Sequence, residues 1–114
     1  MAGDVKTVIF PVRDLAKAKE LFGLLTGVRP YADEAYYVGY RVNGQDIGLD
    51  PNGHAQGMTG PVCYWEVADI NATIGQLTAA GAAVRQPARD VGGGKLVAWL
   101  TDADGNPVGL TQEP

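Results

Sequence analysis

The sequence predicts an α+β fold that contains two βαβββ modules, with strands that are mainly antiparallel. The first observation is a tandem repeat, because three short motifs of the first half recur in the same order in the second half. The second is that each half begins with an apolar stretch of strand character, followed by an Asp and a helical pattern. The matched segments are Val12-Arg13-Asp14-Leu15 with Val67-Ala68-Asp69-Ile70, Gly27-Val28-Arg29-Pro30 with the stretch from Gly81 to Pro87, and Ile47-Gly48-Leu49 with Val108-Gly109-Leu110.

Length and composition limit the class of protein. The 114 residues suit one domain, with a first module at about 1–50, a linker at about 51–60 and a second module at about 61–114. An apolar content of 46% supports a packed core, and no apolar run approaches the ~20 residues of a membrane span. The net charge of −4 argues against a nucleic-acid partner. We expect a cytoplasmic protein, because residues 1–6 lack an apolar signal segment and Cys63 is the single cysteine.

The elements of the first module follow from local signals. Residues 5–12 are rich in β-branched and aromatic side chains, which favours a strand. Asp14 is the expected N-cap of a helix that ends near Gly27. The predicted core face of this helix consists of Leu15, Ala18, Phe22 and Leu25. Further strands are expected at about 28–33, 35–42 and 45–50, and the last two are joined by the hairpin signal Asn43-Gly44.

The second module repeats this order. A strand is expected at residues 62–67, and Asp69 is the expected N-cap of a helix that ends near Gly81. Its predicted core face consists of Ile70, Ile74, Leu77 and Ala80. The remaining strands are expected at about 83–88, 95–101 and 107–112.

These motifs resemble the vicinal oxygen chelate superfamily, which includes glyoxalases, bleomycin-resistance proteins and extradiol dioxygenases. The resemblance covers essentially the whole chain, and Asp102-Ala103-Asp104-Gly105-Asn106 is similar to the family's terminal Asp-Pro-Asp-Gly-Asn hairpin, with Ala103 in place of proline. It implies that the two modules form a cupped sheet around a ligand cavity, with the helices on the outer face. It also implies a homodimer.

The resemblance further implies where metal ligands would lie. Metalloenzymes of the family take His, Glu or Gln from the first and last strand of each module, and the matching positions here are Thr7, Gly48, Val62 and Gly109. Glycine and valine side chains offer no donor atom, and a lone threonine hydroxyl is a poor ligand. We therefore expect no metal and no cofactor, and no metal-dependent glyoxalase or dioxygenase activity.

Strand alternation predicts which side chains face the cavity. The Asn43-Gly44 hairpin pairs Arg41 with Asp46, and the five-residue loop of the second module places Trp99 opposite Gly109. The expected ligand-binding residues are Thr7, Tyr37, Arg41, Asp46, Asp50, Tyr64, Glu66 and Trp99. Aromatic walls with few polar groups are typical of small-molecule sites, and the carboxylates favour a cationic ligand.

Structural roles remain open for the same residues. Arg41 and Asp46 are also consistent with a cross-strand ion pair, and Trp99 with core packing or a dimer interface. Glu66 is equally consistent with a solvated charge at a strand end. The tyrosines are as consistent with packing as with a pocket wall.

Four other features indicate structure rather than chemistry. Gly92-Gly93-Gly94-Lys95 lacks the pattern of a phosphate loop and predicts a flexible hairpin loop, which is a candidate gate for the cavity. His54 is expected to be a solvated loop residue, and Cys63 a buried thiol on the helix-facing side. The acidic loop at residues 102–106 lacks the spacing of a calcium site and predicts a tight turn.

Three functions follow from this reading. The first is a metal-free protein that binds a small organic molecule in the cavity, with antibiotic sequestration as one use. The alternative is an enzyme of the superfamily, similar to its lyases, isomerases or dioxygenases, that uses Glu66, Asp46 or Asp50 as a general base. The third is an ancillary module with no ligand.

Overall fold

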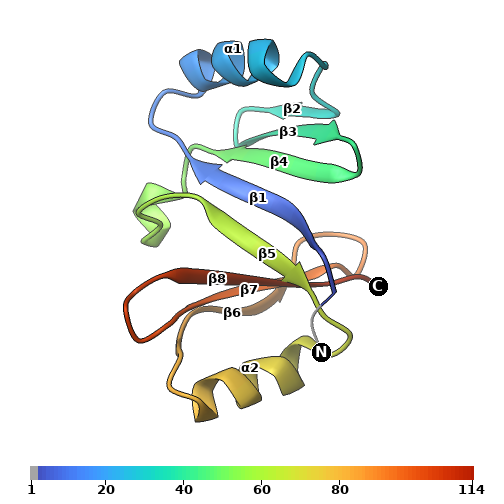
Figure 1. Ribbon diagram of the computed structural model, residues 1–114. Coiled ribbons are helices and arrows are strands. Elements are labelled where there is room, and N and C mark those ends of the chain that lie inside the picture. Colours follow the sequence, from blue (N-terminus) through green and yellow to red (C-terminus); the bar gives the residue numbers. More distant parts are fainter. Residues whose placement is uncertain (1–2) are drawn as a thin grey trace. The chain divides into compact units, whose positions relative to one another are not determined.

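The computed structural model describes residues 3–114, which form two compact modules. Residues 6–62 make up the first module, and residues 63–114 together with residues 3–5 make up the second. Each module has the element order βαβββ, which confirms the predicted α+β class (Figure 1). Within residues 3–114, neither helix has the length and apolar character that crossing a bilayer requires.

The first module contains β1 (Val5–Pro11), α1 (Leu15–Thr26), β2 (Ala32–Glu34), β3 (Tyr37–Val42) and β4 (Gln45–Asp50). The strand order is β2-β3-β4-β1, in which β1 runs parallel to β4 and the other pairs are antiparallel. Asn43 and Gly44 have φ angles of 50° and 81°, as the two-residue hairpin requires. The predicted pairing of Arg41 with Asp46 is confirmed.

The core of the first module lies between α1 and one face of this sheet. Val38, Tyr40 and Leu49 are fully buried there. The Tyr40 hydroxyl donates a hydrogen bond to the Lys19 carbonyl of α1 at 2.9 Å, which ties the helix to β3. Partly buried residues that complete this core are Phe10, Val12, Leu15, Ala18, Phe22, Val42 and Ile47.

Both predicted ends of α1 are confirmed, but one residue of its predicted core face is not. Asp14 Oδ1 accepts the Lys17 N–H at 3.1 Å, and Gly27 caps the helix with a φ of 71°. Leu25 is 73% exposed, so its assignment to the core was wrong. A helical step of ~100° per residue places Leu25 about 60° away from Phe22, at the margin of the core face.

The second module contains β5 (Val62–Glu66), α2 (Ile70–Ala79), β6 (Ala83–Asp90), β7 (Leu96–Thr101) and β8 (Pro107–Gln112). Its strand order is β5-β8-β7-β6, with β5 parallel to β8. The predicted pairing of Trp99 with Gly109 is confirmed. Asp69 caps α2 as predicted by accepting the Ala72 N–H at 3.1 Å.

The core of the second module is built from Val67, Ile70, Ala98, Leu100 and Leu110. Helix α2 packs mainly against β6, β7 and β8 rather than β5. Ala80, expected on the core face, is exposed, because the helix ends at Ala79.

Two connecting segments differ from expectation. The strand expected at residues 28–33 is reduced to Ala32–Glu34, since Pro30 cannot donate to a ladder and restricts the residue before it. In the linker, His54 begins a short 3₁₀ turn and is half-buried rather than solvated. Its Nδ1 is buried without a hydrogen-bond partner among the residues described.

Candidate functional site

The face of the first-module sheet opposite α1 carries one row of polar side chains. The register aligns Thr7 of β1 with Asp46 of β4, and Asp46 with Arg41 of β3. Arg41 Nε donates to Asp46 Oδ1 at 2.8 Å. The side chain of Arg41 is 61% exposed and that of Asp46 only 19%, so the pair presents its guanidinium to solvent. The cross-strand ion pair considered from the sequence therefore forms.

Tyr31 extends this row and was missed by the sequence reasoning. The Arg41 guanidinium carbon lies 4.5 Å from the centre of the Tyr31 ring, which is a cation–π contact. The Tyr31 N–H donates to the Gly39 carbonyl at 2.9 Å, and a Cβ on Gly39 would lie 2.7 Å from Tyr31 Cζ. Tyr31 precedes β2 and belongs to no periodic pattern, so no local signal points to it. The paired glycines Gly39 and Gly48 are the one sequence hint that rings cover this face.

Tyr37 is the second ring on this face. Its side chain is hydrogen-bonded to that of Tyr31 and lies against Gly48. Burial first, and then the hydrogen bond with Tyr31 and the charges of Asp46 and Asp50, raise the pKa of Tyr37 well above its usual value. The phenol therefore stays protonated at neutral pH and acts as a neutral hydrogen-bonding group.

Asp50 lies at the end of β4 and has a local structural role. Its Oδ1 accepts the Asn52 N–H at 2.8 Å and so shapes the start of the linker. Together with Asp46, and with Glu34 of β2, which the register places opposite Tyr37 on the same face, it outweighs the charge of Arg41.

The second-module residues form a separate row. The register aligns Tyr64 of β5 with Gly109 of β8, and Gly109 with Trp99 of β7. Tyr64 and Trp99 are 6% and 5% exposed, so both rings are buried. Glu66 is half-buried at the end of β5, opposite Thr111. Sequence reasoning placed these three residues in the site, and the structure brings Tyr64 and Trp99 onto one row while Glu66 lies two residues further along β5.

Two of the four positions that match the family's metal ligands, Gly48 and Gly109, leave little room for a ligand side chain. A Cβ on Gly48 would lie 2.6 Å from Ile9 Cδ1 and would also collide with Tyr37. A Cβ on Gly109 would lie 2.6 Å from Tyr64 Cγ and 2.8 Å from the Cys63 carbonyl oxygen. Aromatic rings thus occupy the space that a ligand side chain would need. Within residues 3–114, no group of three or more His, Cys, Asp and Glu side chains is placed to hold a metal.

Cys63 is exposed, so its assignment as a buried thiol was wrong. Trp65 on the same face is also 41% exposed. The reason is the placement of α2, which covers β6, β7 and β8 and leaves this face of β5 open.

The two remaining loops have the predicted form. Gly92, Gly93 and Gly94 all have positive φ angles in the turn between β6 and β7, as a glycine hairpin loop requires. In the acidic loop, Asp102 Oδ1 accepts the N–H groups of Asp104 at 2.9 Å and Asn106 at 2.7 Å. These bonds are those of a tight turn.

No protein-family model matches the chain, and no curated protein matches it by sequence. Solved structures are similar to it in fold. A structure described as an NAD-dependent benzaldehyde dehydrogenase from Legionella pneumophila has a TM-score of 0.73 at 17% identity, over 95% of this chain and 98% of that chain. A glyoxalase/bleomycin resistance protein/dioxygenase superfamily member from Vibrio splendidus has a TM-score of 0.71 at 15% identity, over 95% and 97%. A variant of Streptomyces coelicolor methylmalonyl-CoA epimerase, in complex with 2-nitronate-propionyl-CoA, has a TM-score of 0.71 at 14% identity, over 99% of both chains.

Proposed function

Because the chain has the fold of the glyoxalase/bleomycin resistance protein/dioxygenase superfamily, we propose that it binds a small organic molecule without a metal ion. The ligand we propose is a planar aromatic compound that carries a positive charge. Sequestration of an antibiotic of this kind is the use that we favour.

The observation that carries this proposal is the layer formed by Tyr31 and Arg41. Tyr31 is 49% exposed, and the guanidinium above it is held in place by Asp46. A guanidinium fixed in this way offers a flat surface for stacking on an aromatic ring. Because Asp46 neutralises Arg41, the charges left on this face are those of Asp50 and Glu34, which attract a cationic substituent of the ligand.

We expect the binding to need no metal because Gly48 and Gly109 each lie against a tyrosine ring. A ligand side chain at position 48 or 109 would need the volume that Tyr37 and Tyr64 occupy. The binding we propose therefore relies on stacking, hydrogen bonding and charge. We expect purified protein to bind its ligand equally well with and without a metal chelator.

The test is a thermal-shift and calorimetric titration with bleomycin and with a series of planar aromatic amines. Aromatic carboxylates of the same size serve as the charge control. Tyr31→Leu should raise the Kd of a bound amine by about tenfold or more, since a cation–π and stacking contact contributes ~1–2 kcal/mol. Tyr36→Leu is the matched control, because Tyr36 is 66% exposed and belongs to neither row. Equal effects of the two substitutions, or binding that requires a metal, would refute the proposal.

The alternative is an enzyme that uses a carboxylate of these rows as its base. It is favoured by the likeness to methylmalonyl-CoA epimerases. It is also favoured by the position of Asp50, whose charge is close enough to raise the pKa of Tyr37. Incubation with methylmalonyl-CoA in deuterated water should then label the carbon next to the thioester. Asp46→Asn, Asp50→Asn or Glu66→Gln should abolish this exchange, and its absence in the unaltered protein would exclude this reaction.

An ancillary module without a ligand is the third candidate. The burial of Tyr64 and Trp99 favours it, since neither ring is open to stacking as the chain stands. It becomes the conclusion if none of the probes shifts the melting temperature. A homodimer and a cytoplasmic location stay predictions.

A further inference from the structure

The sequence Asn-Gly occurs twice in the chain, and the two copies lie in different surroundings. Asn43-Gly44 forms the turn between β3 and β4, and Asn52-Gly53 lies in the segment that follows β4. In such a sequence the glycine has no side chain to shield its backbone nitrogen. That nitrogen is placed to attack the carboxamide of the preceding asparagine, so both copies have the chemistry for deamidation.

The first copy is open to solvent. Asn43 and Gly44 are both exposed, and a Cβ on Gly44 would meet nothing within 4 Å. The hairpin is closed by the pairing of Val42 with Gln45, not by the turn residues. Within residues 3–114, neither the Asn43 carboxamide nor the Gly44 N–H has a hydrogen-bond partner. The two reacting groups are therefore restrained only by the turn itself.

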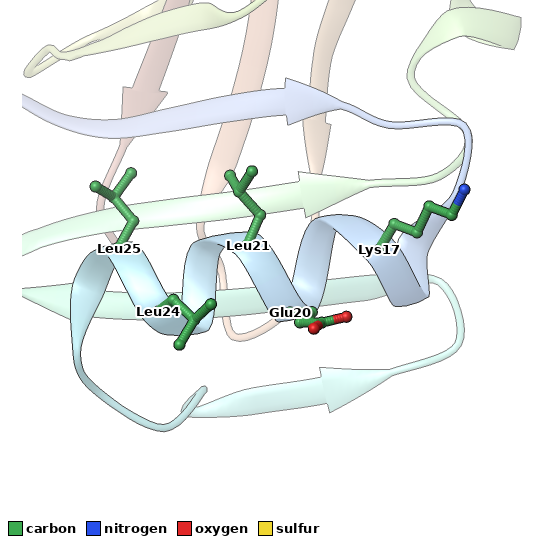
Figure 2. A pocket seen from close by; sticks show the side chains of 5 residues that line it. All are labelled: Lys17, Glu20, Leu21, Leu24 and Leu25. Atoms are coloured by element: carbon green, nitrogen blue, oxygen red, sulfur yellow. The ribbon is translucent and has the colours of Figure 1, made fainter.

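Helix α1 packs against the strands of this hairpin and leaves the turn uncovered. Val42 belongs to the core beneath the helix. On the outer side of α1, Leu21, Leu24 and Leu25 lie in a shallow groove that is lined by residues of this helix alone (Figure 2). The strands are thus held in place while the turn between them stays exposed, which confines local opening to the turn.

The second copy is held by its surroundings. The Gly53 N–H donates to the Asp50 carbonyl at 3.2 Å, and a nitrogen that donates a hydrogen bond loses its proton less readily. Gly53 is also buried, and a Cβ there would lie 2.7 Å from Pro11 Cβ and 3.1 Å from Met58 Sδ. The backbone between Asn52 and Gly53 therefore has little room to rotate for ring closure.

We propose that Asn43 is a site of spontaneous deamidation and that the fold protects Asn52 from the same reaction. The Gly44 nitrogen gives its proton to solvent and attacks Cγ of Asn43, so that a new C–N bond closes a five-membered succinimide. The carboxamide C–N bond breaks, and its nitrogen takes up a proton and leaves as ammonia. Water then opens the imide at either carbonyl, which gives aspartate or isoaspartate. Each event adds one negative charge to the net charge of −4.

The two products differ in their effect on the hairpin. Asp-Gly also suits this turn, so the aspartate product keeps the register of β3 and β4. Isoaspartate leads the main chain through one additional carbon, which a two-residue turn does not accommodate. It therefore disturbs the pairing of Arg41 with Asp46, which holds the guanidinium above Tyr31. A loss of ligand binding in this product rests on the function proposed above, whereas the modification itself does not.

Incubation of the full chain at mildly alkaline pH, followed by peptide mapping with mass spectrometry, tests the proposal. Each deamidation adds about 1 Da, because OH replaces NH2. Trypsin leaves Asn43 and Asn52 on one peptide from Val42 to Arg85, so fragment ions must assign the site. In the folded protein, Asn43 should react at least about tenfold faster than Asn52. In concentrated urea the difference should fall to about threefold or less, because the protection of Asn52 is lost on unfolding.

Two matched variants assign the reaction to its site. Asn43→Asp should lower the total rate of deamidation in the folded protein by about tenfold, and it also supplies the aspartate product as a chromatographic standard against isoaspartate. Asn52→Asp is the control and should leave the total rate nearly unchanged. Equal rates at the two sites in the folded chain, a faster reaction at Asn52, or a folded Asn43 that stays intact while the chain in urea reacts would each overturn the proposal. The mass readout uses no ligand, so its outcome is separate from that of the proposed function.

Discussion

Gly109 is the position where one added methyl group tests the packing of the second module. A Cβ there would lie 2.6 Å from Tyr64 Cγ and 2.8 Å from the Cys63 carbonyl oxygen. Neither atom is the end of a flexible side chain, so the strand or the whole ring must move. Such overpacking costs ~1–3 kcal/mol, and the lower backbone entropy of alanine offsets ~0.5–1 kcal/mol of it.

We expect Gly109→Ala to lower the free energy of unfolding by about 1 kcal/mol and the melting temperature by about 5 °C. Urea denaturation followed by tryptophan fluorescence measures this as a lower midpoint at an unchanged m-value. Gly75→Ala is the matched control, because a Cβ at Gly75 meets nothing within 4 Å and α2 gains helix propensity. Gly48→Ala should lie between them, since its Cβ meets the ends of Tyr37 and Ile9. A Gly109→Ala protein as stable as the unaltered chain would refute the reasoning.

Two further predictions concern pH. Hydrogen bonds from the Asn106 side chain and backbone lower the pKa of Asp102 in the folded protein. The contribution of Asp102 to the free energy of unfolding is therefore present above the ordinary carboxyl pKa of 3.8 and is lost as the pH falls through the lower pKa of the folded state. Urea midpoints of Asp102→Asn and the unaltered protein should therefore differ at pH 6 and converge in acid; a difference that persists in acid would contradict this. Burial raises the pKa of Tyr37 above 10.0. The contribution of Tyr37 to the free energy of unfolding is therefore complete below pH 10 and is lost as the pH rises above it. Tyr37→Phe should make the protein less sensitive to alkali, as circular dichroism measures, and unchanged sensitivity would show that this phenol is not held neutral by the fold.

The sequence predicted best where a local signal has one structural meaning. Asp14 and Asp69 mark helix starts, because an Asp side chain before an apolar periodic segment satisfies free backbone N–H groups. The Asn43-Gly44 turn sets the register of β3 and β4, because both residues tolerate positive φ. That register in turn placed the ion pair of the candidate site.

The failures concern surfaces that depend on distant parts of the chain. The exposure of Cys63 depends on where α2 packs, which strand alternation cannot predict. Leu25 lies at the edge of a helical stripe, where a rotation of about 60° around the helix axis separates core from solvent. Tyr31 lies outside any strand, and only the folded chain brings its ring beneath Arg41.

The tyrosine rings that lie against Gly48 and Gly109 also limit which substitutions these two positions can accept. In the first module the ring comes from Tyr37 on β3, and in the second it comes from Tyr64 on β5, so two different neighbours fill equivalent positions. A single substitution of either glycine by glutamate would meet a ring before it could offer an oxygen to a metal. At position 109, where the base of the Tyr64 ring and a backbone oxygen are in the way, a ligand side chain would need a change at Tyr64 as well as at the glycine, whereas at position 48 the ends of Tyr37 and Ile9 would have to move aside. Position 109 is thus harder than position 48 to convert into a metal ligand by a single mutation.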